Sequence, residues 1–369
     1  MTIRLLAILS ILCSLAAQAQ FTSLNDGEIA EIQKRLAAAG TDSMARNKFI
    51  IIDLFDKARQ TLTEDPHPID TIRTEGLLQG HPKKIATAAA LADMNKMYAL
   101  ALAWRVYGDK IYLYKAISFL KAWATTNKPN GDPIDDTNLD DAIEAFDLIR
   151  NDLANNDREA ITDWLQRTAQ QEIASPRNAP GRATATNNWN SHRLKVIGEI
   201  AFAIGDTALQ SYTIAGLKTQ IEKNLKPDGS SIDFDDRDAL HYHVYDLEPL
   251  LKLAIVLQRA SGIDFYNYQA PTGSSIRKSL EWLLPYLDGT KTHAEFVHSK
   301  VQFDRDRAKN NEPGYLAGTL FDPKQGAQTL LLATWFDDNM LVKAKELIAS
   351  AGKIPPYAIL LKFTLHFRP

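Results

Sequence analysis

Apolar residues recur at helical spacing along almost the whole chain. They return every three or four positions over residues 91–106, and the same spacing resumes over residues 112–123 after a break at Gly108-Asp109. Together these two stretches predict a pair of consecutive amphipathic helices. Similar patterns predict further pairs at 138–152 with 156–172, 188–204 with 206–223, 238–260 with 275–287, and 339–351 with 355–365.

Strand signals are scarce in this sequence, and the best candidate is the short stretch 295–303. No linker rich in Gly, Ser or Pro divides the chain into regions of different composition. We therefore predict an all-α fold, an incomplete (α/α) toroid or barrel of antiparallel helix pairs whose loops form a cleft at one rim. A single domain of this kind is predicted for residues 20–369.

The first stretch of the chain has the pattern of an export signal. Arg4 precedes an apolar run over residues 5–15, and the small-x-small triplet Ala17-Gln18-Ala19 follows it. Since the run is shorter than the ~20 residues that span a bilayer, we predict a signal peptide over residues 1–19 rather than membrane insertion. The mature protein is then exported, to the periplasm or the medium.

Composition and charge narrow the classes of function. The 369 residues are 45% apolar and 24% charged, which is typical of a globular protein. Lys and Arg number 42 against 45 Asp and Glu, so the chain lacks the basic excess that nucleic-acid binding requires. Cys13 is the only cysteine and leaves with the signal. Thiolate nucleophiles, disulfides and Cys-based zinc sites are therefore excluded from the mature chain.

Polar loops and one mixed stretch interrupt the helical pattern at residues 75–80, 127–138, 186–193, 227–245 and 292–307. Five of the eight histidines fall in the last three of these stretches: His192, His241, His243, His293 and His298. This clustering indicates where to look for a functional site.

The stretch 186–193, TNNWNSHR, combines an amide with an imidazole. If a helix begins near Asn187, then Asn188 and His192 share one face, because they are four positions apart. An amide can donate hydrogen bonds to a carboxylate, and a neutral His can accept a proton. Alternatively, Asn187 and Asn188 only cap the helix and His192 is a structural residue.

In the stretch 227–245, Arg237, His241 and Tyr245 are predicted to share one helical face, with Tyr242 on the neighbouring face. A Tyr can act as an acid or a base when a nearby cation lowers its pKa, and Arg237 is a candidate for that cation. Alternatively, Tyr242 is a core residue. His241 and His243 diverge on a helix, which argues against a metal site here.

Two blocks resemble a known family. Residues 225–230 (LKPDGS) followed by 239–250 (ALHYHVYDLEPL) are similar to the "DG…RALxYHxYALxPL" block of the alginate lyase superfamily, and Asn187-Asn188 resembles its "NNH" block. The similarity covers about residues 75–310 and is greatest to the proteins grouped with polysaccharide lyase family 38. It implies that Asn188 binds a uronate carboxylate and that Tyr242 is the catalytic tyrosine.

The chain departs from the family pattern at two positions. Trp189 stands where the family has its catalytic His, and Asp235 stands where it has its Arg, seven residues before the Tyr. His192 and Arg237 are therefore assigned to these roles by proximity and chemical type.

The resemblance implies β-elimination without a metal or other cofactor. Asn188 and Arg237 would stabilise the charge that develops when the C5 proton leaves the uronate. Tyr242 or His192 would take that proton, depending on the face of the sugar that carries it, and Tyr242 would protonate the leaving O4. The residues predicted to contact an acidic polysaccharide are Asn187, Trp189, Arg193, His241, His243 and His293.

Two other classes of function remain open from the sequence. An inverting glycoside hydrolase on the same toroid would need two separated carboxylates. The candidates for that pair are Asp233, Asp235, Asp236 and Asp238. A non-catalytic exported polysaccharide-binding protein would bind without chemistry. Only elimination forms a conjugated unsaturated uronate, so ultraviolet absorbance separates the three classes.

Overall fold

The computed structural model describes residues 22–37, 42–351 and Leu361. The predicted signal peptide, residues 1–19, lies outside the described residues, and so does the helix predicted at 355–365 apart from Leu361.

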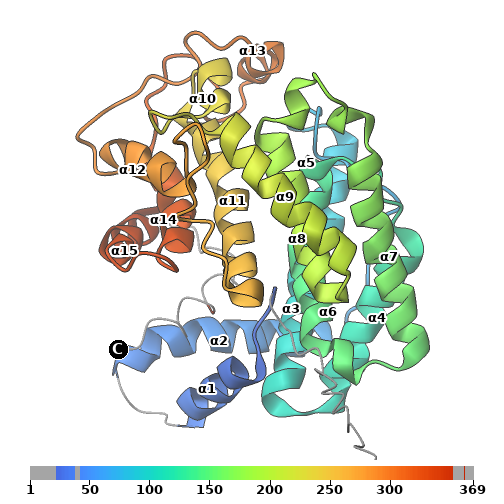
Figure 1. Cartoon of the computed structure of the whole chain (residues 1–369). Coiled ribbons are helices and arrows are strands. Elements are labelled where there is room, and N and C mark those ends of the chain that lie inside the picture. The colour runs from blue at the N-terminus through green and yellow to red at the C-terminus, as the bar shows by residue number, and fades with distance from the viewer. Residues whose placement is uncertain (1–21, 38–41, 352–360, 362–369) are drawn as a thin grey trace, which may run out of the picture.

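Helices account for the regular structure of the described residues (Figure 1). The α-helices are α1 (Asp26–Ala37), α2 (Asp42–Thr61), α3 (Pro82–Tyr107), α4 (Lys110–Thr126), α5 (Pro133–Asp136), α6 (Asp140–Ile149), α7 (Asn155–Ala174), α8 (Asn188–Ile204), α9 (Thr207–Asn224), α10 (Ile232–Arg237), α11 (Leu240–Ser261), α12 (Ile276–Leu287), α13 (Gln302–Lys309), α14 (Ala327–Ala333) and α15 (Met340–Ala351). Short 3₁₀ segments are η1 (Thr137–Leu139), η2 (Arg150–Asp152), η3 (Pro176–Asn178), η4 (Ala183–Ala185) and η5 (Pro323–Gly326).

Local signals in the sequence set the ends of the paired helices. Gly108 ends α3 in the left-handed region at φ 71°, and the carboxylate of Asp109 then accepts the Ile111 N–H at the start of α4. The same pairing of signals separates α8 from α9, because Gly205 ends α8 at φ 75° and Asp206 caps α9. The predicted helix pairs are confirmed at these junctions.

The core consists of two clusters of buried apolar side chains. One gathers α3, α4, α6 and α7, and the other gathers α9, α11, α12, α14 and α15. Helix α8 packs against α6, α7, α9 and α11, so it lies between the two clusters (Figure 1). Because α8 has neighbours on several sides, most of its residues are buried, including polar ones. The prediction of an all-α (α/α) toroid is confirmed.

Two predicted elements differ from the structure. The stretch 295–303 is not a strand, because Phe296 adopts a left-handed φ of 63° and α13 begins at Gln302. The bridges found among the described residues are isolated pairs, Leu225 with Ser231 and Ala294 with Leu320. The helix predicted at 238–260 begins two residues later, since Asp238 is left-handed at φ 47°. In the part of the chain described, no helix has the length and apolar character needed to cross a membrane.

Candidate active site

The N-terminus of α8 holds the two adjacent asparagines. The side chain of Asn187 caps the helix by accepting the Trp189 N–H at 3.1 Å. Asn188 is only 2% exposed, and both its backbone N–H and its side-chain amide donate to the carboxylate of Asp233 on α10. Burial raises the pKa of Asp233 to about 6 in spite of these hydrogen bonds. Asn188 is therefore held in a fixed orientation against α10.

His192 lies one turn further along α8. Its Nδ1 is 2.9 Å from the Thr137 hydroxyl, and its ring centroid is 4.3 Å from that of Tyr245. Its Nε2 is buried and has no hydrogen-bond partner among the described residues. Burial lowers the pKa of His192 to about 3, so the imidazole is neutral near pH 7. A neutral ring with a free nitrogen can accept a proton or a hydrogen bond from a bound molecule.

A break in the chain brings Arg237 to Tyr242. Arg237 ends α10, Asp238 is left-handed, and Ala239 is extended before α11 begins at Leu240. This turn places the guanidinium Cζ 3.6 Å from the centroid of the Tyr242 ring, and Nη2 donates to the Tyr242 hydroxyl. The prediction that Arg237 lies on one continuous helix with Tyr242 is wrong, but the two side chains do meet.

Tyr242 is 6% exposed, and a second guanidinium contacts its hydroxyl. Nη1 of Arg307, on α13, donates to the Tyr242 oxygen at 2.7 Å and to the Tyr315 oxygen at 2.9 Å. Burial raises the pKa of Tyr242 well above its ordinary value, against the opposing effect of both guanidiniums. The phenol is therefore protonated in the free protein.

The two guanidiniums differ in their acidic partners. Arg237 forms a two-pronged ion pair with Asp304, which is 1% exposed and also accepts from the Ser299 hydroxyl at 2.6 Å. The closest ion pair of Arg307 joins its Nε to a Glu312 oxygen at 3.7 Å, which is beyond hydrogen-bond length.

Three of the residues that surround Tyr242 have no assigned role in the sequence analysis, namely Asp304, Arg307 and Tyr315. The stretch 292–307 interrupts the helical pattern and carries two of the clustered histidines, and this is the only signal that points to Arg307. The contact joins residues 65 positions apart, which local spacing does not encode.

Two predicted substrate contacts, His241 and Trp189, lie against other side chains of the region. The His241 ring is edge-on to Tyr242 at 5.0 Å, with Nδ1 2.8 Å from Gln325 Oε1 and Nε2 3.4 Å from the Tyr315 hydroxyl. The Trp189 ring is partly exposed and lies 5.1 Å from the guanidinium of Arg177.

Three side chains predicted to bind substrate instead bind other groups of the protein. Arg193 is completely buried and its Nε lies 3.4 Å from Glu172, so it leaves no face for a ligand. His243 is also completely buried, between the Ser231 hydroxyl and a backbone carbonyl. His293 binds the backbone carbonyl of Asp238 at 3.1 Å and so supports the turn. We exclude these three side chains from the site.

The connection between α2 and α3 borders the site. Asp135 accepts hydrogen bonds from the backbone N–H groups of Thr74 and Glu75 at 2.6 and 3.0 Å. Further along, the Gln79 N–H donates to Glu312 at 2.7 Å, next to Arg307. The loop 74–80 therefore joins the α5 region to the segment that follows α13.

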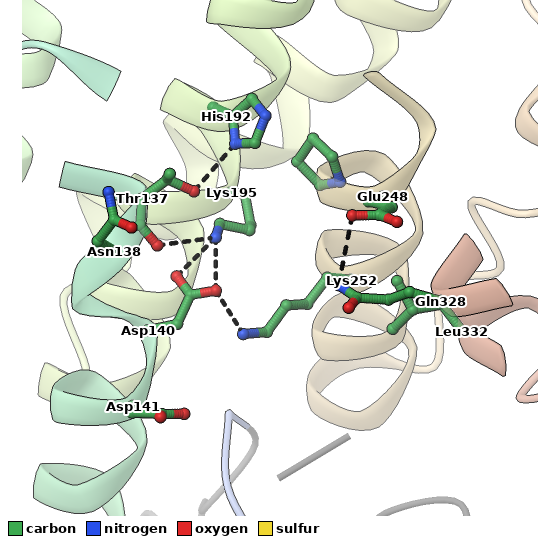
Figure 2. A pocket seen from close by; sticks show the side chains of 11 residues that line it. Thr137, Asn138, Asp140, Asp141, His192, Lys195, Glu248, Lys252, Gln328 and Leu332 are labelled. Atoms are coloured by element: carbon green, nitrogen blue, oxygen red, sulfur yellow. Dashed lines mark hydrogen bonds and ion pairs between the residues drawn. The ribbon is translucent and has the colours of Figure 1, made fainter. Parts of the chain in front are cut away.

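A cavity of about 240 Å³ is lined by His192 and by charged side chains of α6, α8 and α11 (Figure 2). Its lining residues are Thr137, Asn138, Asp140, Asp141, His192, Lys195, Glu248, Pro249, Lys252, Gln328 and Leu332. Burial acts to raise the pKa of Asp140, but the ammonium groups of Lys195 and Lys252 hold it below its ordinary value. Within the described ranges, no group of three or more His, Cys, Asp or Glu side chains is placed to hold a metal ion.

The four acids that are candidates for the carboxylate pair of a hydrolase each have a separate partner. Their partners are the Asn188 and Asn224 amides for Asp233, Lys226 for Asp235, Lys300 for Asp236, and the His298 N–H for Asp238. Each carboxylate is committed to a different partner. Among these four acids, no two carboxylates are left free to flank a glycosidic bond, as the hydrolase alternative requires.

Comparisons with known proteins agree with this fold. An alginate lyase from Bacteroides ovatus is similar in structure, with a TM-score of 0.63 and 18% identity over 91% of this chain and 97% of that one. Alginate lyase A1-III from Sphingomonas species A1 has a TM-score of 0.54 and 18% identity over 83% of this chain and 94% of its own. A variant of A1-III complexed with a tetrasaccharide has a TM-score of 0.53 and 18% identity, over 74% of this chain and 79% of its own. No curated protein sequence matches.

Residues 43–293, more than half of the chain, match the family model of alginate lyase. The resemblance noted in the sequence is thereby confirmed. The chain belongs to the alginate lyase family of polysaccharide lyases.

Proposed function

We propose that this polysaccharide lyase is exported and cleaves a uronic-acid-containing polysaccharide by β-elimination without a metal ion. Alginate or polymannuronate, or glucuronan, is the candidate substrate. The observation that carries the proposal is the Tyr242 hydroxyl, which accepts hydrogen bonds from Arg237 and Arg307. The family supports the substrate class, and so do the alginate lyases of similar fold.

Tyr242 is the acid in this mechanism. Since the two guanidiniums occupy the lone pairs of its oxygen, its own hydrogen is left to be donated. Where another group is the base, the raised pKa keeps that hydrogen in place until the glycosidic bond begins to break. The leaving O4 then receives the proton.

Asn188 and Arg237 counter the charge on the uronate. Removal of the C5 proton adds negative charge next to a carboxylate that is already anionic, so hydrogen-bond donors and positive charge lower the barrier. The Asn188 amide has two hydrogens, and Asp233 accepts from this group in the free protein. The second hydrogen of the amide is the one assigned to the substrate carboxylate.

The base depends on the sugar. In mannuronate and glucuronate, H5 and O4 lie on the same face of the ring, so Tyr242 would both remove the proton and protonate O4. For this it would first release its hydroxyl proton to water and act as the phenolate that Arg237 and Arg307 stabilise. In guluronate, H5 lies on the opposite face, and His192 would remove it through Nε2, which is free in the described structure. Asn187, Trp189 and His241 remain proposed substrate contacts.

A substrate panel tests the proposal. Purified protein is incubated with mannuronate-rich and guluronate-rich alginate, glucuronan and glycosaminoglycans, and the absorbance of the unsaturated uronate is followed. We expect product from at least one polyuronate. New reducing ends without absorbance would support hydrolysis instead, and binding without either product would support a binding protein.

A further inference from the structure

We propose that Arg307 is a further catalytic residue of this lyase, the cation that stabilises the Tyr242 phenolate formed as the glycosidic bond breaks. The inference rests on the proposed function, because it requires Tyr242 to act as the acid. It assigns to α13 a direct role in the reaction.

The Arg307 guanidinium is firmly positioned. A single nitrogen, Nη1, lies within hydrogen-bond distance of both the Tyr242 and Tyr315 oxygens. The Cζ atom lies 4.6 Å from the Tyr315 ring centroid and 4.5 Å from that of Phe303. Contact with two aromatic rings holds the planar group in one orientation. Little reorganisation is then needed when charge develops on the Tyr242 oxygen.

Carboxylates compensate the positive charge of Arg307 less closely than that of Arg237. The two-pronged pair with Asp304 compensates the charge of Arg237 at close range. The acids that face Arg307 are Glu75 and Glu312, and neither accepts a hydrogen bond from it in the described structure. Its Nε is buried and has no hydrogen-bond partner there. The less compensated charge is therefore the one best placed to stabilise a new anion.

A chain of hydrogen bonds orients Tyr315 toward Arg307. Gln325 Oε1 can only accept, so the hydrogen of the neutral His241 ring lies on Nδ1 and its Nε2 is an acceptor. Tyr315 can then donate its own hydrogen to His241 Nε2, and its oxygen accepts from Arg307. Tyr315 is thus a positioning residue, which holds the guanidinium in place.

With His192 as the base, atoms and electrons are conserved in the step. The base takes the C5 proton, and the C5–H electron pair becomes the second bond between C4 and C5. The C4–O4 bond breaks, and O4 takes the hydroxyl proton of Tyr242. The phenolate is left between the N–H groups of Arg307 and Arg237. The base releases its proton to water, and Tyr242 regains one from water.

The test compares Arg307→Gln and Arg307→Lys with Arg305→Gln. Arg305 is an exposed residue of the same helix whose guanidinium binds Gln302 and the Ser299 carbonyl, so it is the matched control. We expect kcat on the responsive polyuronate to fall about a hundredfold or more in Arg307→Gln, with a smaller change in KM. Arg307→Lys should recover part of that loss, because it keeps the charge but not the fork that reaches both phenols.

A second variant, Tyr315→Phe, tests the same role if Arg307→Gln does not fold. This variant keeps Arg307 but removes one of the two acceptors that position its guanidinium, so kcat should fall about fivefold to tenfold at unchanged KM. Folded Arg307 variants with wild-type kcat would overturn the role of Arg307, and so would a loss confined to KM. Wild-type protein that forms no unsaturated product from any polyuronate would overturn the proposed function itself.

Discussion

Removing one oxygen atom tests the central residue of the site. In Tyr242→Phe the ring remains, and so can its edge-on contact with His241 and the Arg237 guanidinium stacked on its face. The acid is lost, and general acids contribute about a hundredfold to ten-thousandfold, or roughly 3–5 kcal/mol of barrier. Stability should fall by only about 1–3 kcal/mol, because two N–H groups lose an acceptor while Arg237 keeps Asp304.

The assay is the initial rate of unsaturated uronate formation, with melting temperature as a check on folding. Tyr286→Phe serves as the control, because that phenol is on α12, where its ring packs 5.3 Å from Trp282. We expect kcat to collapse in Tyr242→Phe and to stay at the wild-type level in Tyr286→Phe. A folded Tyr242→Phe protein with kcat within tenfold of wild type would refute the assignment of Tyr242 as the acid.

Three further predictions concern the support of the site. Asn188→Ala should lower kcat about a hundredfold or more and destabilise the fold by about 1–3 kcal/mol, because buried Asp233 loses a donor; a lower melting temperature at normal kcat would reduce Asn188 to a structural role. Because burial lowers the pKa of His192 to about 3, its ring stays unprotonated over about pH 5–8. The pH profile of kcat/KM should therefore show no step near pH 6.5 that is present in the wild type and absent in His192→Gln; such a step would contradict the prediction. Gly131→Ala should destabilise the protein by about 2 kcal/mol or more in thermal or urea unfolding, since φ is 69° and the new Cβ would lie 2.3 Å from the Gln171 carbonyl oxygen; wild-type stability would contradict this.

The long helices could be predicted from the sequence because each carries its own signals. The predicted 188–204 coincides with α8, which has Asn187 as its cap and Gly205 as its left-handed end. Helices α10 and α13 have six and eight residues, too few for a stable helix in isolation, and they pack against each other through the Arg237–Asp304 pair. Their formation depends on tertiary contacts, which apolar periodicity does not reveal.

The site was predictable only where chemistry and local spacing coincide. Tyr242 and Arg237 are five positions apart and do meet, whereas Arg307 reaches Tyr242 from 65 positions away. Arg193 shows the opposite case, because its polar stretch predicts a substrate contact and the side chain is buried. Helix α8 has neighbours on several sides, so its polar residues turn into the protein and bind partners there. Residue type alone does not distinguish a buried ion pair from a substrate contact.

The left-handed turn at Asp238 explains why Arg237 meets Tyr242 although the two do not lie on one continuous helix. Five positions on one continuous helix differ by roughly 140° around the axis, so Arg237 and Tyr242 would point apart. In the structure, the Asp238 carbonyl accepts the Phe296 N–H at 2.7 Å, and its carboxylate accepts the His298 N–H at 2.8 Å. The segment that stabilises this turn continues into α13, which carries Arg307. The same segment therefore stabilises the turn that brings Arg237 to Tyr242 and carries Arg307 to the Tyr242 hydroxyl.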